Sequence, residues 1–204
     1  MSRAAASARS RKAPKARRAR GSLSRTEILA AGLRIAREDD LRNLTMKRLG
    51  DELGVTAMAI YRHFENKGEL IEGLLDRFVR EADVTGHGVD PTDWREWTTQ
   101  TALRQYRALA STPGVVPFVA TSSAWRFGTA AMTTMEESLG VLERAGFAKS
   151  AALEIQMNAL AMAIGWATLG SDGDAGASRS RVSSGSARIF EQGLAQYLSS
   201  LSPR

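Results

Sequence analysis

The chain contains no cysteine and only two histidines among its 204 residues. The absence of cysteine excludes disulfide bonds and thiolate metal sites. His63 and His87 stand far apart in the sequence, and neither has the neighbouring ligands that a metal ion needs. We therefore expect no metal and no cofactor.

Apolar runs long enough to cross a membrane are also missing. The two longest uncharged runs are residues 108–125, which Pro113 and Pro117 interrupt, and residues 155–171, which contain Gln156 and are short for a span. No secretory hydrophobic segment lies near the N-terminus. The composition thus predicts a cytoplasmic protein with no membrane partner.

Recognisable catalytic chemistry is absent as well. We find no nucleophile and base at a known spacing, no glycine-rich phosphate loop after a strand, and no cluster of metal ligands. The acidic run at residues 172–174 is too short for a calcium loop. We expect that the protein is not an enzyme.

The chain is basic, with a formal net charge of +6 at pH 7. Residues 1–22 hold eight arginines and lysines and no acidic residue, which leaves the rest of the chain close to neutral. This segment has too little apolar surface to offset its ordering entropy, so we expect a disordered basic arm. The arm could follow DNA phosphates or enter the minor groove, or it could be a solubilising extension with weak, nonspecific affinity.

The most informative stretch is residues 45–64, which has the pattern of two short amphipathic helices joined by a tight turn. Thr45 is a candidate N-cap, and the apolar positions that follow it at i, i+3, i+4 and i+7 are Met46, Leu49, Gly50 and Leu53. Gly54 can end this helix in the left-handed conformation. Thr56 is a second candidate N-cap, and the same spacing recurs in Ala57, Ile60, Tyr61 and Phe64. The pattern predicts a helix-turn-helix that reads DNA, with a plain helical hairpin as the alternative.

The flanks of this stretch favour the DNA-binding interpretation. Ser24 and Glu27 have the form of a capping box, which predicts a helix with apolar positions at Ile28, Leu29, Gly32, Ile35 and Ala36. A further helix beginning near Asn66 has the apolar seam Leu70, Ile71, Leu74, Leu75 and Phe78. Together these helices predict a complete DNA-binding domain over residues 23–84.

With LTMKRLGDELGV, AIYRHF and NKGEL in this order, residues 23–80 resemble the N-terminal domain of the TetR-type (TetR/AcrR) family of transcriptional regulators. The resemblance implies an all-α homodimer with an N-terminal three-helix helix-turn-helix headpiece and a C-terminal helical domain for ligand binding and dimerisation. It also implies that a small molecule releases the operator.

Three positions depart from the family pattern. Asp40 stands where a glycine is usual, which indicates a differently closed end of the first helix. Gly32 and Gly50 stand where alanines are usual, and each should weaken its helix by about 1 kcal/mol.

The resemblance also assigns DNA contacts. Thr45 and Lys47 would lie near the backbone and the groove edge, and the base-proximal set would be Thr56, Ala57, Met58 and Ala59. Alanine and methionine can touch thymine methyl groups but cannot donate hydrogen bonds, so DNA shape would supply much of the specificity. Tyr61 would pack its ring in the headpiece and offer its hydroxyl to a phosphate. The other phosphate candidates are Arg62, His63 and Lys67. Alternatively, His63 only caps a carbonyl, and Arg62 and Lys67 only face solvent.

A break at TGHGVDPTD, residues 85–93, separates this domain from a second one over residues 90–204. We expect helices over about 93–109, 115–120, 124–145, 149–169 and 188–201, with a flexible loop over 171–187. The helix over 149–169 is apolar on most of its circumference and must be covered from several sides. The last two long helices are therefore predicted to pair with those of a second protomer. Such a dimer predicts a palindromic operator.

An effector pocket in the second domain is the remaining expectation. Its candidate lining residues are Trp97, Tyr106, Phe118, Trp125, Phe127, Met132, Met135, Met157 and Trp166. Ordinary core packing is the alternative for each of them. As a set they favour a small apolar or aromatic effector.

The sequence thus predicts a ligand-responsive transcriptional regulator, most simply a repressor, that binds double-stranded operator DNA as a homodimer in the cytoplasm, at the nucleoid. The alternative is a nonspecific or architectural DNA-binding protein driven by the basic arm.

Overall fold

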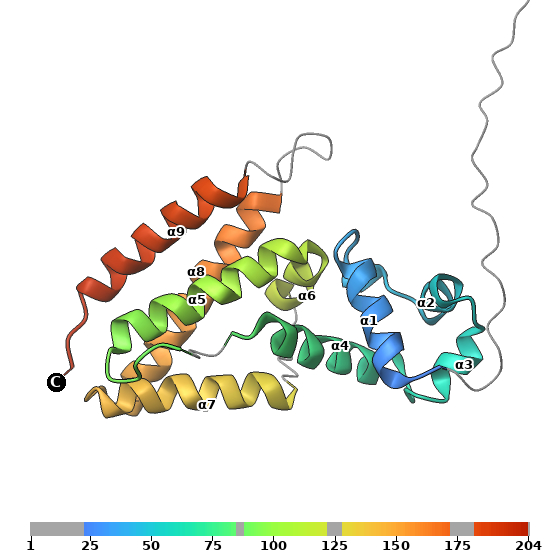
Figure 1. Ribbon diagram of the computed structural model, residues 1–204, viewed down its shortest axis with the longest axis horizontal. Helices are drawn as coiled ribbons and strands as arrows, with labels where there is room; N and C mark the ends of the chain where they lie inside the picture. Colours follow the sequence, from blue (N-terminus) through green and yellow to red (C-terminus); the bar gives the residue numbers. More distant parts are fainter. Residues whose placement is uncertain (1–22, 85–87, 122–127, 172–181, 204) are drawn as a thin grey trace, which may run out of the picture.

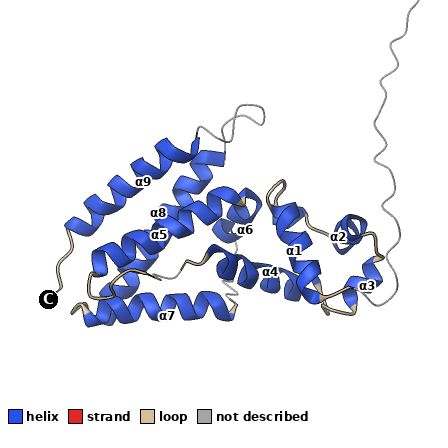
Figure 2. Ribbon diagram, in the orientation of Figure 1, coloured by secondary structure: helices blue, strands red, loops and turns tan. Residues whose placement is uncertain are grey.

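The computed structural model describes residues 23–84, 88–121, 128–171 and 182–203 (Figure 1). All regular elements in these ranges are helical, which confirms the all-α prediction (Figure 2). The basic arm of residues 1–22 lies outside the described residues.

The first group of helices forms the expected headpiece. Its elements are α1 (Arg25–Ala36), the 3-10 turn η1 (Leu41–Asn43), α2 (Met46–Leu53), α3 (Ala57–Tyr61) and α4 (Lys67–Ala82). The predicted capping box is present, because the Ser24 hydroxyl accepts from the amide of Glu27 at 3.2 Å and the Ser24 amide donates to the Glu27 carboxylate at 3.0 Å. The side chains buried between these helices include Ile28, Leu49, Ile60, Phe64, Leu70 and Leu74. The core thus uses the predicted apolar stripes.

The end of α1 is closed in the unusual way that Asp40 indicated. No left-handed residue follows the helix. Instead, the Asp40 carboxylate accepts from the amide of Arg42 at 2.8 Å and begins η1. The end of α1 itself is closed by backbone bonds, because the amides of Glu38 and Asp39 donate to the carbonyl of Ile35 at 3.0 and 2.9 Å without a left-handed residue.

The second group of helices packs around α5. Its elements are α5 (Trp94–Ser111), η2 (Pro113–Val115), α6 (Val116–Thr121), α7 (Thr129–Arg144), α8 (Lys149–Ser171) and α9 (Val182–Ser199). The Asp93 carboxylate caps α5, as expected, by accepting from the amide of Glu96 at 3.0 Å. In Figure 1, α5 lies between α9 and the α4–α7 pair while α8 passes behind it, and α5 contacts all four of these helices.

Two predicted boundaries were wrong. Helix α7 begins at Thr129 rather than near residue 124, because Gly128 precedes it in an extended conformation. Helix α9 begins at Val182, so residues 182–187 are helical and not part of a loop. Serine and glycine predicted a loop there, but a helix anchored by buried residues further along can propagate into a weak segment.

Two close contacts join the groups, one in η2 and one at the start of α7. Gly114 in η2 lies against the backbone at the end of α1, where an added Cβ would overlap the carbonyl oxygens of Ala36 and Asp39. At the start of α7, the Asp76 carboxylate of α4 accepts a hydrogen bond from the amide of Ala130 at 2.8 Å. Helix α4 therefore supplies the cap for α7.

The contact at Gly114 predicts a large cost for the smallest possible side chain. Gly114→Ala should lower the free energy of unfolding by about 1–3 kcal/mol, because the methyl group meets backbone that cannot turn away. Gly140→Ala in α7 is the matched control, since its methyl group would meet only the end of the Arg144 side chain. The control should gain up to about 1 kcal/mol from helix propensity. Chemical denaturation of both variants measures the difference, and equal stability of the two would contradict the packing.

Candidate nucleic-acid interface

The turn between α2 and α3 is closed tightly. The Thr45 hydroxyl caps α2 by accepting from the amide of Arg48 at 3.0 Å, and Gly54 ends the helix with a φ of 69°. The amide of Val55 then donates to the carbonyl of Gly50 at 2.9 Å. A Cβ on Gly50 would lie 2.8 Å from the carbonyl oxygen of Val55, which is closer than real Cβ atoms come. Gly50, expected only to weaken its helix, therefore lets the turn fold back onto α2.

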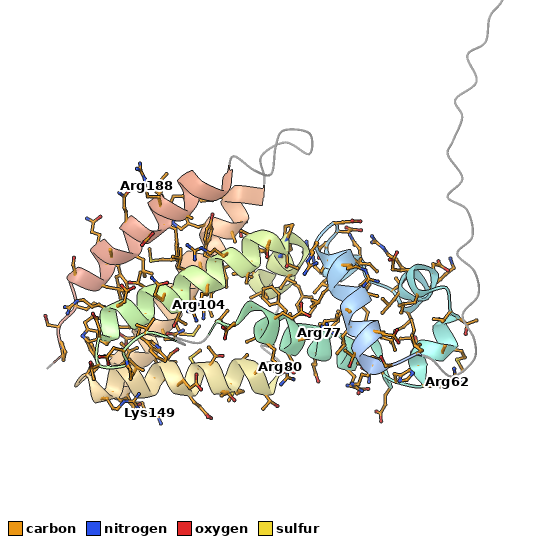
Figure 3. The ribbon with its side chains drawn as sticks, in the orientation of Figure 1. Arg62, Arg77, Arg80, Arg104, Lys149 and Arg188 are labelled. Atoms are coloured by element: carbon orange, nitrogen blue, oxygen red, sulfur yellow. The ribbon has the colours of Figure 1, made fainter. Side chains whose placement is uncertain are left out.

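Most of the predicted DNA-contacting residues lie on the outside of this helix pair. Ile60 and Phe64 are buried in the core, whereas Met58 is 72% exposed. The exposed members of the set are Thr45, Lys47, Thr56, Met58, Tyr61, Arg62 and Lys67, and the half-buried ones are Ala57, Ala59 and His63. Ala57 packs partly against the core and is the least available. Figure 3 shows Arg62 at the end of the headpiece that lies farthest from α8 and α9.

Two details of α3 differ from the prediction. Thr56 occupies the N-cap position, but its hydroxyl makes no capping bond within the described headpiece. Tyr61 is 46% exposed, so its ring does not pack in the core as expected. The helix ends at Tyr61 with Arg62 as its C-cap, and the chain then turns so that Phe64 fills the core position. The Thr56 and Tyr61 side chains are consequently both available at the surface.

Lys67 and His63 both make contacts within the headpiece. The Lys67 ammonium donates to the carbonyl of Arg42 at 2.9 Å and joins the start of α4 to η1. An ammonium has three donors, and this one is exposed, so two donors remain for a phosphate. The carbonyl of His63 accepts from the Arg25 guanidinium at 2.7 Å.

Arg25 organises the same end of the headpiece, and the sequence analysis missed it. Its guanidinium lies 2.8 Å from the Glu69 carboxylate and 4.1 Å from the centroid of the Phe64 ring. The amide of Glu65 and then Arg25 hold the pKa of Glu69 below its usual value. Arg25 thus joins α1, the end of α3 and the start of α4. Arg25 stands in the first turn of α1, where a solvated arginine is common, so nothing in the sequence indicates this role.

Two further carboxylates brace the segment that leads into α2. The Arg48 guanidinium and the Asn43 amide hold the pKa of Asp39 below its usual value. Burial acts to raise the pKa of Asp40, but bonds from Arg42 outweigh it and the pKa is lowered. Both groups are therefore held as carboxylates that support the folded headpiece.

A polar groove of about 390 Å³ lies where α1 meets α4. Its lining residues are Arg25, Thr26, Leu29, Gly73, Asp76, Arg77 and Arg80. Figure 3 labels two of its arginines, and both have partners: Arg77 donates to the carbonyl of Thr26 at 2.7 Å, and Arg80 pairs with Asp76. These bonds give the groove a structural role in joining α1 and α4.

The candidate pocket residues of the second group are not all in one place. Tyr106 is buried and stacks on Phe190, with 5.0 Å between the ring centroids, which is core packing. Met132 and Met157 are 50% and 38% exposed, which contradicts an internal lining role. Helical spacing alone cannot distinguish an inward from an outward apolar side chain. The half-buried candidates are Trp97, Phe118, Met135 and Trp166. Trp125 and Phe127 lie outside the described residues.

Helix α8 carries several large apolar residues on its exposed side, although Ile155 is buried in the core. Its buried face consists mostly of small residues: Ala152, Ala159, Ala163 and Ala167. Its exposed face carries Leu153, Met157 and Leu169, and Ile189 of α9 is exposed as well. This exposed apolar surface, Leu153, Met157, Leu169 and Ile189, is called the α8–α9 face below.

Two other kinds of site find no support in the part of the chain that is described. No group of histidine, aspartate and glutamate there could hold a metal ion. No helix there combines the length and the apolar character needed to cross a bilayer.

The comparisons with known proteins agree with this geometry. The family model for bacterial regulatory proteins of the tetR family matches residues 28–74. A transcriptional repressor of the helix-turn-helix type from Mycobacterium tuberculosis is 28% identical over 141 residues, which cover 68% of this chain and 54% of the relative. The chain thus spans about half the length of that relative.

Two other similar proteins match over most of the chain. The class A tetracycline repressor from transposon 1721 of Escherichia coli is 29% identical over 203 residues, which cover 87% of this chain and 89% of the relative. A crystallised TetR variant from Acinetobacter baumannii, in complex with minocycline, has a TM-score of 0.70 at 23% identity and covers 88% of this chain and 96% of its own. This second likeness shows a shared fold.

The lowered pKa values predict that acid destabilises the headpiece. The ordinary pKa values of these groups are 3.8 for Asp39 and Asp40 and 4.5 for Glu69, and all three are lower in the folded protein. Their contribution is therefore complete above these values and is lost as the pH falls through the folded pKa values. The unfolding temperature should drop as the pH is lowered from about 6 to about 3, and Asp39→Asn should reduce that dependence.

Asp51→Asn is the control, since Asp51 is exposed in the same headpiece and pairs only with Lys47 across 3.4 Å. Thermal unfolding across this pH range compares the two variants with the unmodified protein. If Asp39→Asn left the pH dependence as steep as Asp51→Asn does, the role of the Asp39 carboxylate would be refuted.

Proposed function

We propose, from the premise that this chain belongs to the tetR family of bacterial regulatory proteins, that it is a transcriptional repressor whose homodimer binds a palindromic operator and releases it when a small effector binds. The observation that carries the proposal is the exposed outer side of α3, with Met58 at its centre, on a helix pair whose turn is tightly closed. A rigid helix presented in this way fits the major groove.

The DNA surface proposed here combines an apolar reading helix with a polar surround. Met58 and Ala59 would touch thymine methyl groups, while Thr45, Lys47, Thr56, Tyr61, Arg62, His63 and Lys67 would lie near the backbone. Because these two side chains cannot donate hydrogen bonds to bases, the shape of the DNA would supply part of the preference for the operator sequence. Ala57, which packs inward, would contribute least.

The α8–α9 face is proposed as the dimer interface. A monomer would leave its large apolar side chains in water, whereas a second copy would bury them across a two-fold axis. Two headpieces would then face two half-sites, one helical turn or a multiple of it apart.

Effector release requires that the second group of helices act on the headpiece. Two contacts support such a route: Gly114 against the end of α1, and the Asp76 carboxylate on the amide of Ala130. Any movement of α6 or α7 would be passed to α1 and α4 at these points. The coupling is reciprocal, so operator DNA should also weaken effector binding. The similarity to a protein named as a tetracycline repressor and to a TetR variant crystallised with minocycline supports a small-molecule effector as a class.

Substitutions can distinguish a residue that contacts bases from one that contacts phosphates, because the two should affect the choice of DNA sequence differently. Met58→Ala should change which sequence is preferred, because it alters a base contact. Lys67→Ala should weaken all duplexes similarly and reduce the salt slope by about one. In vitro selection from randomised duplexes, followed by titration at several salt concentrations, measures both effects.

Met132→Ala and Lys149→Ala are the matched controls, because both residues are exposed and lie outside the headpiece. Deleting residues 1–22 distinguishes the repressor from a nonspecific DNA-binding protein driven by the basic arm. A sequence-specific dimer should keep its preference for the selected DNA sequence, whereas an arm-driven binder should lose most of its affinity for DNA. Absence of any selected sequence would refute the repressor.

The dimer interface predicts a strong effect of one charge. Met157→Lys should raise the dimer dissociation constant at least tenfold, which corresponds to about 1.4 kcal/mol, because an ammonium would be buried against apolar side chains. Met132→Lys places the same charge on α7 at a similarly exposed site and should leave the constant unchanged. Sedimentation equilibrium compares the two. Equal behaviour of both variants would exclude the α8–α9 face.

A further inference from the structure

Three polar atoms on one side of α5 are buried without a hydrogen-bond partner. They are the indole nitrogen Nε1 of Trp97, the hydroxyl Oγ1 of Thr101 and the carboxamide oxygen Oε1 of Gln105, and none has a partner among the described residues. Trp97, Thr101 and Gln105 stand at i, i+4 and i+8, so they form one line along the helix. This line is called the α5 polar stripe below. Folded proteins pair nearly all such groups, so three orphans in a row need a reason.

The same helix shows how a buried threonine is ordinarily satisfied. The Thr98 hydroxyl donates to the carbonyl of Trp94, four residues earlier, at 2.7 Å. Thr134 of α7 likewise donates to the carbonyl of Ala130 at 3.0 Å. Thr101 is as deeply buried as Thr98, with only 1% of its surface exposed, yet its hydroxyl does not bond in this way.

The helices that cover α5 do not supply the missing partners. Helix α8 packs on α5 with a buried face made largely of Ala152, Ala159 and Ala163, whose side chains carry no donor or acceptor. The interior holds other buried polar side chains as well, among them Ser138 and Gln156, but only the three atoms of the stripe lack a hydrogen-bond partner among the described residues.

We propose that the α5 polar stripe recognises the effector, and that the effector is a neutral aromatic compound with carbonyl acceptors and a hydroxyl group, such as a hydroxylated aromatic ketone or quinone. This inference rests on the proposed function, and it narrows the apolar or aromatic effector expected from the aromatic and methionine residues. Helix geometry spreads the stripe over about 12 Å, the length of two to three fused rings.

The chemistry of the three groups sets the ligand class. An indole N–H only donates, so Trp97 requires an acceptor on the ligand. The Thr101 hydroxyl both donates and accepts, and the Gln105 carboxamide can present either its oxygen or its NH₂ group. None of the three carries a charge, so nothing in the stripe would compensate a charged ligand for its desolvation.

The stripe is closed in this structure, because Thr101 is almost fully covered. An effector that reaches it has to part α5 from the helices packed on it, and α7 is one of these. Helix α7 is capped by Asp76 of α4, so parting these helices would move the connecting helix of the headpiece. Recognition and release would then be one event.

The first test needs no ligand. Thr101→Val removes an orphaned hydroxyl while keeping the shape of the side chain, so it should raise the unfolding temperature of the full-length protein. Thr98→Val is the matched control on the same helix, and it should lower that temperature because it removes a formed bond. If Thr101→Val lowers the unfolding temperature as much as Thr98→Val does, the Thr101 hydroxyl already has a partner and the proposal is overturned.

The second test measures binding of 1,8-dihydroxyanthraquinone, with anthracene as the probe of equal ring number and no polar atom. Isothermal titration or quenching of tryptophan fluorescence should give at least tenfold tighter binding of the quinone to the unmodified protein. Thr101→Val and Gln105→Leu should each weaken quinone binding about tenfold and leave anthracene unchanged, whereas Thr98→Val should change neither. Equal affinity for the two probes, or quinone binding that ignores both substitutions, would overturn the proposed class.

Both measurements are made without DNA, so their failure is distinct from failure of the repressor function. A protein that selects an operator but binds the quinone no better than anthracene loses only the effector class. A protein that binds the quinone through Thr101 but selects no operator retains the polar site and loses the regulatory role.

Discussion

The start of α7 and its position against the headpiece depend on one hydrogen bond, in which the amide of Ala130 donates to the Asp76 carboxylate. The first amides of a helix have no partner inside that helix, and α7 starts at Gly128, which has no side chain to offer them. The cap therefore comes from α4, a helix of the other group. A charged acceptor at a helix N-terminus also interacts favourably with the helix dipole. Because Gly128 lies so close to Asp76 that a Cβ could not fit between them, the cap fixes the distance between α4 and α7 as well as the start of α7.

A second contact, at Gly114 of η2, joins the same two groups of helices as the cap on α7. Gly114 holds η2 against the carbonyl oxygens at the end of α1, so the second group of helices contacts the headpiece at η2 as well as at the start of α7. Two contacts of this kind would transmit a shift of η2 and α7 to α1 and α4 together. The proposed effector control would need an element with two arrangements that both sites can bias, and these two contacts are where such an element would act on the headpiece.

The sequence predicted what is local and failed where tertiary contacts decide. The caps at Ser24 and Thr45 could be predicted because donor and acceptor lie within three residues of each other. Tyr61 was placed in the core because its spacing fits the apolar stripe, yet α3 is too short for the stripe to continue, and Phe64 takes that place from the following turn. The sequence pattern around Asp76 is that of an exposed acidic helix residue. Its partner Ala130 lies 54 residues away, so no local pattern predicts the hydrogen bond between them. The helix predicted over about 188–201 is present but ends at Ser199, and it extends back to Val182 through residues whose propensity argues against it.

The α5 polar stripe is another feature that the sequence pattern alone could not predict. Thr98 and Thr101 are three residues apart on one helix and are equally buried, so no pattern of hydropathy separates them. Their difference appears only in the hydrogen bonds: Thr98 is satisfied by its own helix, and Thr101 is not. An unsatisfied buried group raises the free energy of the ligand-free fold, and a ligand that satisfies it recovers that free energy in one state only. A molecule that pairs with the stripe therefore stabilises the arrangement in which α5 and α7 stand apart relative to the closed arrangement, and such a difference in affinity between two states is the condition for an effector to shift them.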